Sequence, residues 1–264
     1  MKLAILCSDD AHHGYLVDRL AERFTIAAVV VEPVRCQRRR LRIKGRYRDW
    51  FWALYHFWRR EFLGLNRYRR TYFGGNGPRP IANTAWLNTE WINDPAVLEL
   101  LAVVEPDITI VMGTSSLKTP VLQAARTAIN IHGGFLPFYR GNHCFFFALY
   151  QEAFDHIGST IHFVDSGIDT GDMIELVVPP LFPTDNAEKL YSRAEKMAIH
   201  RLVALLSALE AGMALPRRKQ PEKGRLYRTR DRGPWHDLAL FVRLRLGITR
   251  IPARPAEAIR QIKP

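Results

Sequence analysis

Residues 2–31, KLAILCSDDAHHGYLVDRLAERFTIAAVVV, decide the fold class of this chain. Two short apolar runs, 2–8 and 26–31, lie on either side of a segment, 12–24, in which apolar residues recur at helical spacing. Such runs are typical of buried strands, and the two aspartates after the first run are suited to cap the helix. This strand–helix–strand order predicts an α/β fold, a Rossmann-like, open, mostly parallel twisted sheet with helices on both faces.

The same alternation returns later in the chain. Between the second strand and residue 78 it stops, and after residue 216 the sequence is basic and irregular. We therefore predict a main domain over 1–215, which carries a basic, aromatic insertion over 34–78, and a basic C-terminal extension over 216–264. The predicted helices are 95–104, 120–125, 142–150 and 186–211, and the predicted strands are 107–112, 128–131, 160–164 and 173–178.

Composition indicates a folded protein of the cytoplasm. The chain has 264 residues, of which 47% are hydrophobic and 24% charged, so it can bury a core. Its three cysteines follow no pattern, which predicts neither a disulfide framework nor a zinc site and fits a reducing compartment. The start, MKLAILCSDD, does not read as a signal peptide, and no apolar run approaches the roughly 18 residues of a membrane span.

The net charge of +12 is distributed unevenly. Residues 34–72 hold 13 Lys and Arg against 2 acidic residues, a net charge of +11, and residues 217–264 hold 14 against 4, a net charge of +10. The rest of the chain must then carry −9. The sequence therefore predicts a mildly acidic body with two strongly basic additions.

Two predicted strands end in polar, glycine-rich loops. NIHGG (130–134) follows one of them, and VDSGIDTG (164–171) follows another. In open parallel sheets, ligands bind at the carboxyl ends of the strands, so we expect Asn130, His132 and Asp169 to lie near one crevice. The glycines would let the backbone approach a ligand closely.

These loops belong to two longer stretches, NIHGGFLPFYRG (130–141) and GSTIHFVDSGIDTGD (158–172), which resemble the signature of the formyltetrahydrofolate-dependent formyltransferases. That family includes glycinamide ribonucleotide transformylase, methionyl-tRNA formyltransferase and the amino-sugar N-formyltransferases. The similarity spans roughly 1–33 and 80–210. One departure is clear: Gly133-Gly134 replaces the common Pro-Ser, which predicts a pocket wall of different shape.

The resemblance implies a mechanism and a catalytic trio. A neutral amine would attack the formyl carbon of 10-formyltetrahydrofolate, and an oxyanion would develop in a tetrahedral intermediate. By family match, Asn130 and His132 would stabilise this oxyanion. Asp169 would pair with the histidine, favour its imidazolium form and offer a route for the proton of the amine. Neither a metal ion nor a covalent enzyme intermediate is implied.

The resemblance also implies binding residues. The pterin end of the folate would lie against two loops and contact Ser116, Leu117, Lys118, Asp165, Gly167 and Ile168. The candidates for acceptor binding are His12, Tyr139, Arg140 and His143. Each of these also has a plainer interpretation, as a helix cap, a packed loop residue or a surface charge. His162 is interpreted as a strand histidine that supports the site.

Three alternatives compete for the insertion. It could be a cap whose aromatic residues pack on the core, a nucleic-acid-binding surface, or a surface that lies on an anionic membrane. Our hypothesis is that it helps to hold a negatively charged acceptor or places the protein near a membrane. The residues that would enter the membrane are Trp50, Phe51, Trp52, Phe57, Trp58 and Phe62.

The expected acceptor is a small-molecule amine, a nucleotide-linked amino sugar. Methionyl-tRNA formyltransferases carry a whole C-terminal barrel domain, whereas only a short tail follows residue 216 here, so tRNA is the alternative acceptor. A formyltetrahydrofolate hydrolase and a non-catalytic module that binds nucleic acid or membrane stay open, as does a homodimer. The expected location is the cytoplasm, with peripheral contact at the inner membrane face.

Overall fold

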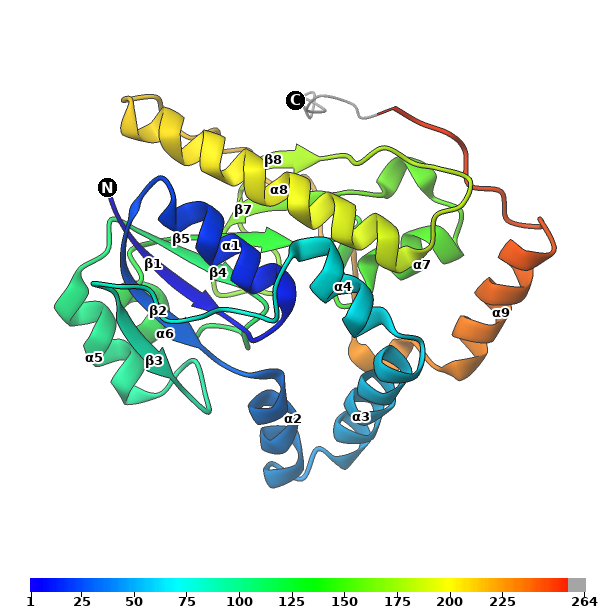
Figure 1. Ribbon diagram of the computed structural model, residues 1–264, viewed down its shortest axis with the longest axis horizontal. Helices are drawn as coiled ribbons and strands as arrows, with labels where there is room; N and C mark the ends of the chain where they lie inside the picture. The colour runs from blue at the N-terminus through cyan, green and yellow to red at the C-terminus, as the bar shows by residue number, and fades with distance from the viewer. Residues whose placement is uncertain (256–264) are drawn as a thin grey trace.

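The computed structural model describes residues 1–255, and in this range seven strands form one twisted sheet with helices on both faces (Figure 1). The strand order is β3-β2-β1-β4-β5-β7-β8. The first five are mutually parallel, whereas β7 runs antiparallel to both of its neighbours. The strands are β1 (Lys2–Cys7), β2 (Thr25–Val31), β3 (Ala85–Asn88), β4 (Ile108–Met112), β5 (Thr127–His132), β7 (Ser159–Phe163) and β8 (Met173–Val177). The predicted fold class, an open and mostly parallel α/β sheet, is confirmed.

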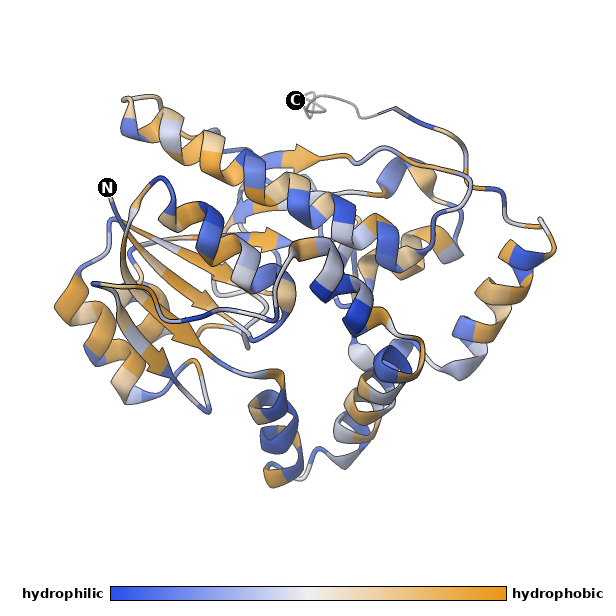
Figure 2. Ribbon diagram, in the orientation of Figure 1, coloured by the Kyte–Doolittle hydropathy of each residue, from blue (hydrophilic) through white to orange (hydrophobic). Residues whose placement is uncertain are grey.

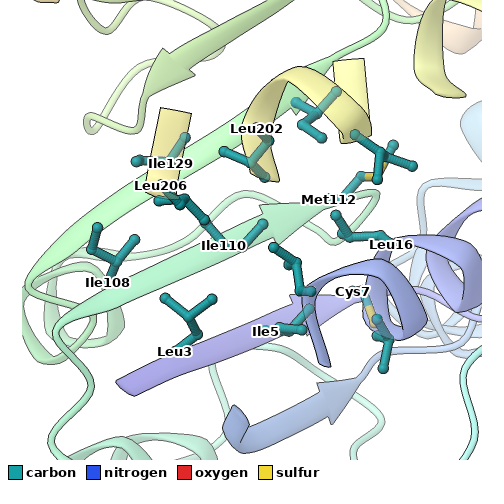
Figure 3. Close-up of a cluster of buried hydrophobic side chains, with 14 of the residues drawn as sticks. Leu3, Ile5, Cys7, Leu16, Ile108, Ile110, Met112, Ile129, Leu202 and Leu206 are labelled. Carbon is teal, nitrogen blue, oxygen red and sulfur yellow. The ribbon is translucent and has the colours of Figure 1, made fainter. Parts of the chain in front are cut away.

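Helices α1 (Ala11–Ala21) and α8 (Ala187–Glu210) cover one face of the sheet, and α5 (Pro95–Val104) and α6 (Thr119–Ala124) cover the other. Side chains alternate along β1, so Leu3, Ile5 and Cys7 pack against α1 and α8 (Figure 3), whereas Ala4 and Leu6 face α5 and α6. The sheet is therefore buried on both sides, as its continuous apolar strands predict.

Local capping determines where these helices begin. The Asp10 carboxylate accepts a hydrogen bond from the Ala11 amide at 2.8 Å, and Asp94 accepts one from the Ala96 amide at 3.0 Å. The Asn186 side chain accepts two, from the first turn of α8, both at 3.0 Å. These side chains satisfy amides that have no partner within the helix, and they explain why three predicted starts lie within one residue of the observed ones.

The insertion folds into three helices, α2 (Val34–Ile43), α3 (Tyr47–Phe62) and α4 (Leu65–Phe73). Helix α4 packs on α1 and α8 and buries Arg69 and Phe73. Helices α2 and α3 project from the body (Figure 1), and both contain hydrophilic and hydrophobic residues (Figure 2). Trp50, Trp52 and Phe57 are half-buried, whereas Phe51, Trp58 and Phe62 are exposed. Several aromatic residues of the insertion therefore do not pack on the core.

The tail after residue 216 is not irregular, so that prediction is wrong. It contains β9 (Arg225–Tyr227), which pairs with β6 (Tyr139–Gly141), the 3₁₀ turn η2 (Thr229–Asp231) and helix α9 (Pro234–Arg245). The pairing buries Tyr227, whose ring stacks on Phe147 of α7 (Cys144–Tyr150) with centroids 4.2 Å apart. Sequence periodicity does not predict β9 because three residues carry no pattern. The division at residue 216 stays a prediction.

Strands β3 and β6, the turn η1 (Phe154–His156) and the three helices of the insertion also escaped the sequence analysis. Strand β3, AWLN, is short and lies at the edge of the sheet, and η1 is a single turn. Helix α7 begins at Cys144 rather than 142 because His143 has a left-handed backbone, with φ of 59°. No helix within residues 1–255 combines the length and the apolar character that crossing a bilayer would require.

Candidate active site

Asn130 and His132 lie on one face of β5, near its carboxyl end. Strand β5 pairs with β7 in a register that sets Asn130 opposite His162 and His132 opposite Thr160. Because residues two apart on a strand point to the same side, these four side chains share one face of the sheet. The opposite face carries Ile129 and Ile131, which pack in the core below α8. The polar side chains are thus placed by the strand period itself.

Asp169 lies beside His132 because of the path of the loop that follows β7, which the sequence analysis did not predict. Strand β7 is antiparallel to β5, so its carboxyl end does not lie at the carboxyl edge of β5, and that step of the prediction is wrong. Instead, the loop after β7 folds back across the sheet. The Gly141 amide donates a hydrogen bond to Asp169 Oδ2 at 2.8 Å, and Gln220 in the tail donates to the Asp169 carbonyl at 3.0 Å. These contacts hold Asp169 Oδ2 at 3.5 Å from His132 Nδ1.

His162 orients Asn130. Its Nδ1 lies 2.7 Å from the Phe163 carbonyl, which can only accept, so Nδ1 carries the proton. Burial lowers the pKa of His162 to about 4, and the neutral ring therefore has an unprotonated Nε2. That nitrogen accepts a hydrogen bond from Asn130 Nδ2 at 3.0 Å, which fixes which end of the amide points toward β7. The second Asn130 N–H stays available for another acceptor.

His132 is held between two acceptors. Its Nε2 donates to the Tyr139 carbonyl at 3.0 Å, and its Nδ1 faces Asp169. A protonated ring therefore has a partner for each N–H. The Cys144 thiol lies 3.7 Å from Nε2, and burial raises the pKa of this thiol well above its usual range, so it stays protonated. The ring is buried, which removes competing water from its hydrogen bonds.

The structure explains why Gly133 and Gly134 replace the Pro-Ser pair that is common in the family. A Cβ at Gly134 would collide with His132 Nε2 and would lie 2.7 Å from the Tyr139 carbonyl oxygen. A Cβ at Gly133 would lie 2.7 Å from the ring of Tyr191, on the other side of the chain. Both glycines therefore make room for side chains that line or support the site.

Gly134→Ser is expected to displace the His132 ring and to lower kcat/KM by about a hundredfold, because misplacement of a catalytic group by about 1 Å has that effect. Serine is common at the matching position of the family, which makes the expectation specific to this chain. Steady-state kinetics would measure the loss, and Gly75→Ala is the matched control because nothing lies within 4 Å of its added Cβ. An active Gly134→Ser enzyme would mean that the ring has another productive position.

A cavity of about 500 Å³, the inner cavity, begins beside this trio. Gly133, Gly141 and Cys144, which neighbour or contact the trio, form part of its wall. Its other walls come from the β1–α1 loop, α8, the insertion helices and α9. The lining includes Ser8, His12, His13, Arg59, Arg60, Arg69, Tyr191, Glu195, Phe241 and Leu244.

A second cavity of about 460 Å³, the outer cavity, lies beyond it between α2, α3 and α4. The two share Asp10, Val34, Arg60, Asn142 and His143 as a common wall. The lining of the outer cavity also includes Arg35, Gln37, Arg38, His56, Phe57, Asn66, Arg70 and Asn76. The two cavities are therefore adjacent, and their shared wall lies between Gly133 and Cys144, beside the trio, and the insertion helices.

Several buried ionisable groups surround the inner cavity. Asp10 binds Arg60 at 2.6 Å and Arg69 at 2.8 Å. Burial alone would raise the pKa of Asp10, but the charge of Arg69 and the neighbouring cations keep it well below its usual value. Glu195 accepts a hydrogen bond from Ser159 Oγ at 2.7 Å, and burial raises the pKa of Glu195 to about 7. Its Oε2 has no partner within residues 1–255.

The predicted acceptor-binding residues divide into two pairs. His12 and His143 line the inner cavity, and burial lowers the pKa of each well below its usual value, so both are neutral. Tyr139 and Arg140 are not among the lining of either cavity. Tyr139 donates to Gln151 at 2.7 Å, and Arg140 donates to the Ile168 carbonyl at 3.1 Å, so both hold loops together.

The loops that hold the predicted folate-binding residues are both anchored by side chains. Asn93 donates to the Ser116 carbonyl at 3.0 Å and accepts from the Lys118 amide, and Leu117 is buried. In the other loop, Asp165 accepts from the Gly167 amide at 3.0 Å, and Ile168 is exposed.

Glu32 is a residue that the sequence analysis missed. This buried carboxylate accepts from the Ser115 amide at 2.7 Å and pairs with Arg40 of α2. It thereby ties the loop at 113–118 to the insertion. Within residues 1–255, no three His, Cys, Asp or Glu side chains form a group that could hold a metal ion.

Fold and site together define an α/β protein with a polar trio at the end of β5, beside the wall of the inner cavity. The model of the formyl transferase family matches residues 74–206, which is half of the chain. This protein belongs to the formyl transferase family. The sequence is 32% identical over 151 residues to the methionyl-tRNA formyltransferase of Syntrophus aciditrophicus (strain SB), an alignment that covers 55% of this chain and 48% of that protein. The chain thus spans about half the length of the curated relatives it matches.

Solved structures share the fold at low identity. A likely sugar N-formyltransferase from Mycobacterium tuberculosis aligns over 100% of both chains with a TM-score of 0.59 and 16% identity. Glycinamide ribonucleotide transformylase 1 from Symbiobacterium toebii aligns over 83% of this chain and 93% of that chain, with a TM-score of 0.54 and 18% identity. At this identity the likeness extends to the fold alone.

Proposed function

We propose that this protein is an N-formyltransferase, which moves the formyl group of 10-formyltetrahydrofolate to a primary amine. The observation that carries the proposal is the convergence of Asn130, His132 and Asp169 at the end of β5, next to the inner cavity. Folate would lie against the loops that contain Ser116–Lys118 and Asp165–Ile168. The amine would enter from the inner cavity.

In this scheme the amine nitrogen attacks the formyl carbon, and the carbonyl oxygen gains negative charge. The free N–H of Asn130 donates to that oxygen, and a protonated His132 stabilises it by charge. Asp169 accepts the proton that the amine nitrogen loses, directly or through water. The bond between the formyl carbon and N10 then breaks, and N10 takes up the proton that Asp169 accepted, directly or through water, which yields the formamide and tetrahydrofolate.

The proposed acceptor is a nucleotide-linked amino sugar, and cations of the insertion support it. Arg35, Arg38 and Arg70 line the outer cavity, and none of them forms an ion pair with an acidic side chain in the described part of the chain. Phosphates are the groups that unpaired arginines recognise, through charge-assisted and often bidentate hydrogen bonds. A ligand with an amine at one end and a diphosphate at the other would span the two cavities.

Arg35→Ala and Arg70→Ala are each expected to raise KM for the acceptor roughly tenfold and to leave KM for 10-formyltetrahydrofolate unchanged, since one charge-assisted hydrogen bond contributes about 1.5 kcal/mol. Arg42→Ala is the matched control: it removes the same charge from α2, at an exposed position outside the lining of both cavities. A rise in the folate KM instead would place the folate, and not the acceptor, in the outer cavity.

The activity is tested by absorbance-monitored release of tetrahydrofolate against a panel of amines. The panel holds nucleotide-linked amino sugars, glycinamide ribonucleotide and charged initiator tRNA, with an amine-free reaction to detect hydrolysis. Turnover with an amino sugar supports the proposal in full. Turnover in the amine-free reaction would identify a hydrolase, and the absence of turnover with every acceptor would contradict the proposed activity.

Charged initiator tRNA is the second candidate acceptor. The matching relatives are methionyl-tRNA formyltransferases, and the two basic segments could contact a phosphate backbone. Binding to tRNA would weaken steeply with salt, because each neutralised phosphate releases counterions. Turnover on tRNA with such a salt dependence, and none on amino sugars, would decide for this candidate.

A further inference from the structure

We propose that the apolar faces of α3 and α9 form a docking surface for an anionic lipid bilayer. This inference goes beyond formyl transfer and does not depend on which amine is formylated. Both helices carry exposed apolar side chains that no other part of the described chain covers. On α3 these are Tyr47, Phe51, Trp58 and Phe62, and on α9 they are Trp235, Leu238, Phe241, Val242 and, just beyond its end, Leu246 and Ile248.

The exposed side chains of α3 form one stripe. Positions 47, 51, 58 and 62 are spaced by four, seven and four residues, which sets them within about 60° of each other around a helix. Phe62, at the end of this stripe, is 82% exposed, and Trp235 at the start of α9 is 80% exposed. Monomeric proteins rarely leave several large aromatic side chains in water together, so this stripe needs a partner.

The two helices are tied together at their inner sides. The Tyr55 hydroxyl on α3 donates to Asp237 on α9 at 2.8 Å, and Arg59 pairs with the same carboxylate at 3.5 Å. Leu63, just after α3, and Phe241 on α9 both line the inner cavity and are both exposed. Exposed apolar residues of both helices therefore lie next to the inner cavity. Figure 2 shows hydrophobic residues along α3 and α9.

The charge near this apolar surface indicates which partner it fits. Exposed cations lie close to these apolar residues in the chain: Arg42 and Lys44 precede α3, Arg48 is in its first turn, Arg245 ends α9 and Arg250 follows it. A second copy of this chain would bring two segments of net charge +11 together, which like-charge repulsion disfavours. RNA would match the cations but would leave the aliphatic residues of α9 in water. A bilayer with anionic headgroups matches both features, since aromatic side chains enter the interface and Lys and Arg remain among the headgroups.

The test is flotation of the full chain with vesicles of phosphatidylcholine, with and without about one third phosphatidylglycerol, without folate or acceptor. We expect binding to the anionic vesicles that weakens with salt. The double variant Phe62→Ser with Trp235→Ser is expected to bind at least roughly tenfold more weakly, because two large apolar side chains no longer enter the interface. Both positions are exposed, so folding should not depend on them.

The matched control is Val103→Ser with Met213→Ser, which removes two exposed apolar side chains far from α3 and α9 (Figure 1) and should leave vesicle binding unchanged. Equal flotation of wild type and the Phe62 and Trp235 variant would overturn the proposal. A dimer in gel filtration that this variant abolishes, without vesicle binding, would overturn it in favour of self-association. Competition of RNA with binding at the same surface, without flotation, would overturn it in favour of a nucleic acid. These experiments measure binding to lipid and not catalysis, so their outcome does not depend on whether the protein transfers formyl groups.

Discussion

His132→Ala is expected to lower kcat/KM for formyl transfer by about a thousandfold, which corresponds to about 4 kcal/mol of transition-state stabilisation. The ring lies between the Tyr139 carbonyl and Asp169, and in the proposed mechanism it stabilises the developing oxyanion. The loss should fall on kcat more than on either KM, because the ring acts on charge that appears only in the transition state. Release of tetrahydrofolate, measured at varied folate and acceptor concentrations, gives both constants.

Two further variants and one control make this result specific. Asn130→Ala and Asp169→Asn should cause comparable losses, and combining them with His132→Ala should add little, since the three act as one unit. His200→Ala is the control, because this histidine bonds Tyr15 on the far side of α8 and contacts neither cavity. Full activity in all three trio variants would refute a catalytic role and would favour a binding module on this scaffold.

Acidification from pH 7 to pH 4 is expected to unfold the protein through its buried histidines. Burial lowers the pKa of His13, His56 and His162 from 6.5 to about 4 each. Below pH 6.5 these histidines bind protons in the unfolded chain but stay neutral in the folded chain. Their contribution to the free energy of unfolding is therefore fully present above pH 6.5 and is lost as the pH falls toward 4. A difference of 2.5 pKa units is worth up to about 3 kcal/mol per histidine, against a total stability of about 5–15 kcal/mol.

Glu195 acts in the opposite direction, because burial raises its pKa from 4.5 to about 7. In the folded state the Glu195 carboxyl group stays protonated up to a higher pH than in the unfolded state. Its contribution to the free energy of unfolding is therefore fully present below pH 4.5 and is lost as the pH rises toward 7. One raised carboxyl group offsets about one buried histidine, and burial also lowers the pKa of His12 and His143, so the net expectation remains a loss of stability in acid.

Urea denaturation at pH 7 and pH 5 would measure this loss. His56→Gln is the informative variant: its amide can still donate to the Thr229 carbonyl, as the His56 ring does at 3.0 Å, but it cannot titrate. This variant should lose the share of the pH dependence that His56 contributes, whereas His200→Gln on the surface should keep most of it. Equal free energies of unfolding at the two pH values would show that the buried histidines are hydrated in solution.

The sequence could predict most of the central sheet because its signals are local. Apolar runs identify β1, β2, β4 and β5, and cap residues next to periodic segments identify α1, α5 and α8. The candidate trio could also be named in advance, because two motifs carry it in order. Strand β3 and helix α9 could not be predicted with the same rules, since one is too short to show a period and the apolar residues of the other are not confined to one face.

Other features depend on contacts between residues far apart in the chain. The support of Asn130 by His162 depends on the register of β5 against β7, and the approach of Asp169 depends on a loop that returns from an antiparallel strand. Neither register nor loop path is encoded in a short window of residues.

Residue types alone thus determined the α/β fold, the polar loop that follows β5 and the excess of positive charge in two segments. Only the tertiary structure decided which of those charges are neutralised, as Arg60 and Arg69 are by Asp10, and which face a cavity or water, as Arg35 and Arg70 do. The physical reason is that secondary structure follows from the spacing of apolar residues, whereas the free energy of a charge depends on what surrounds it after folding.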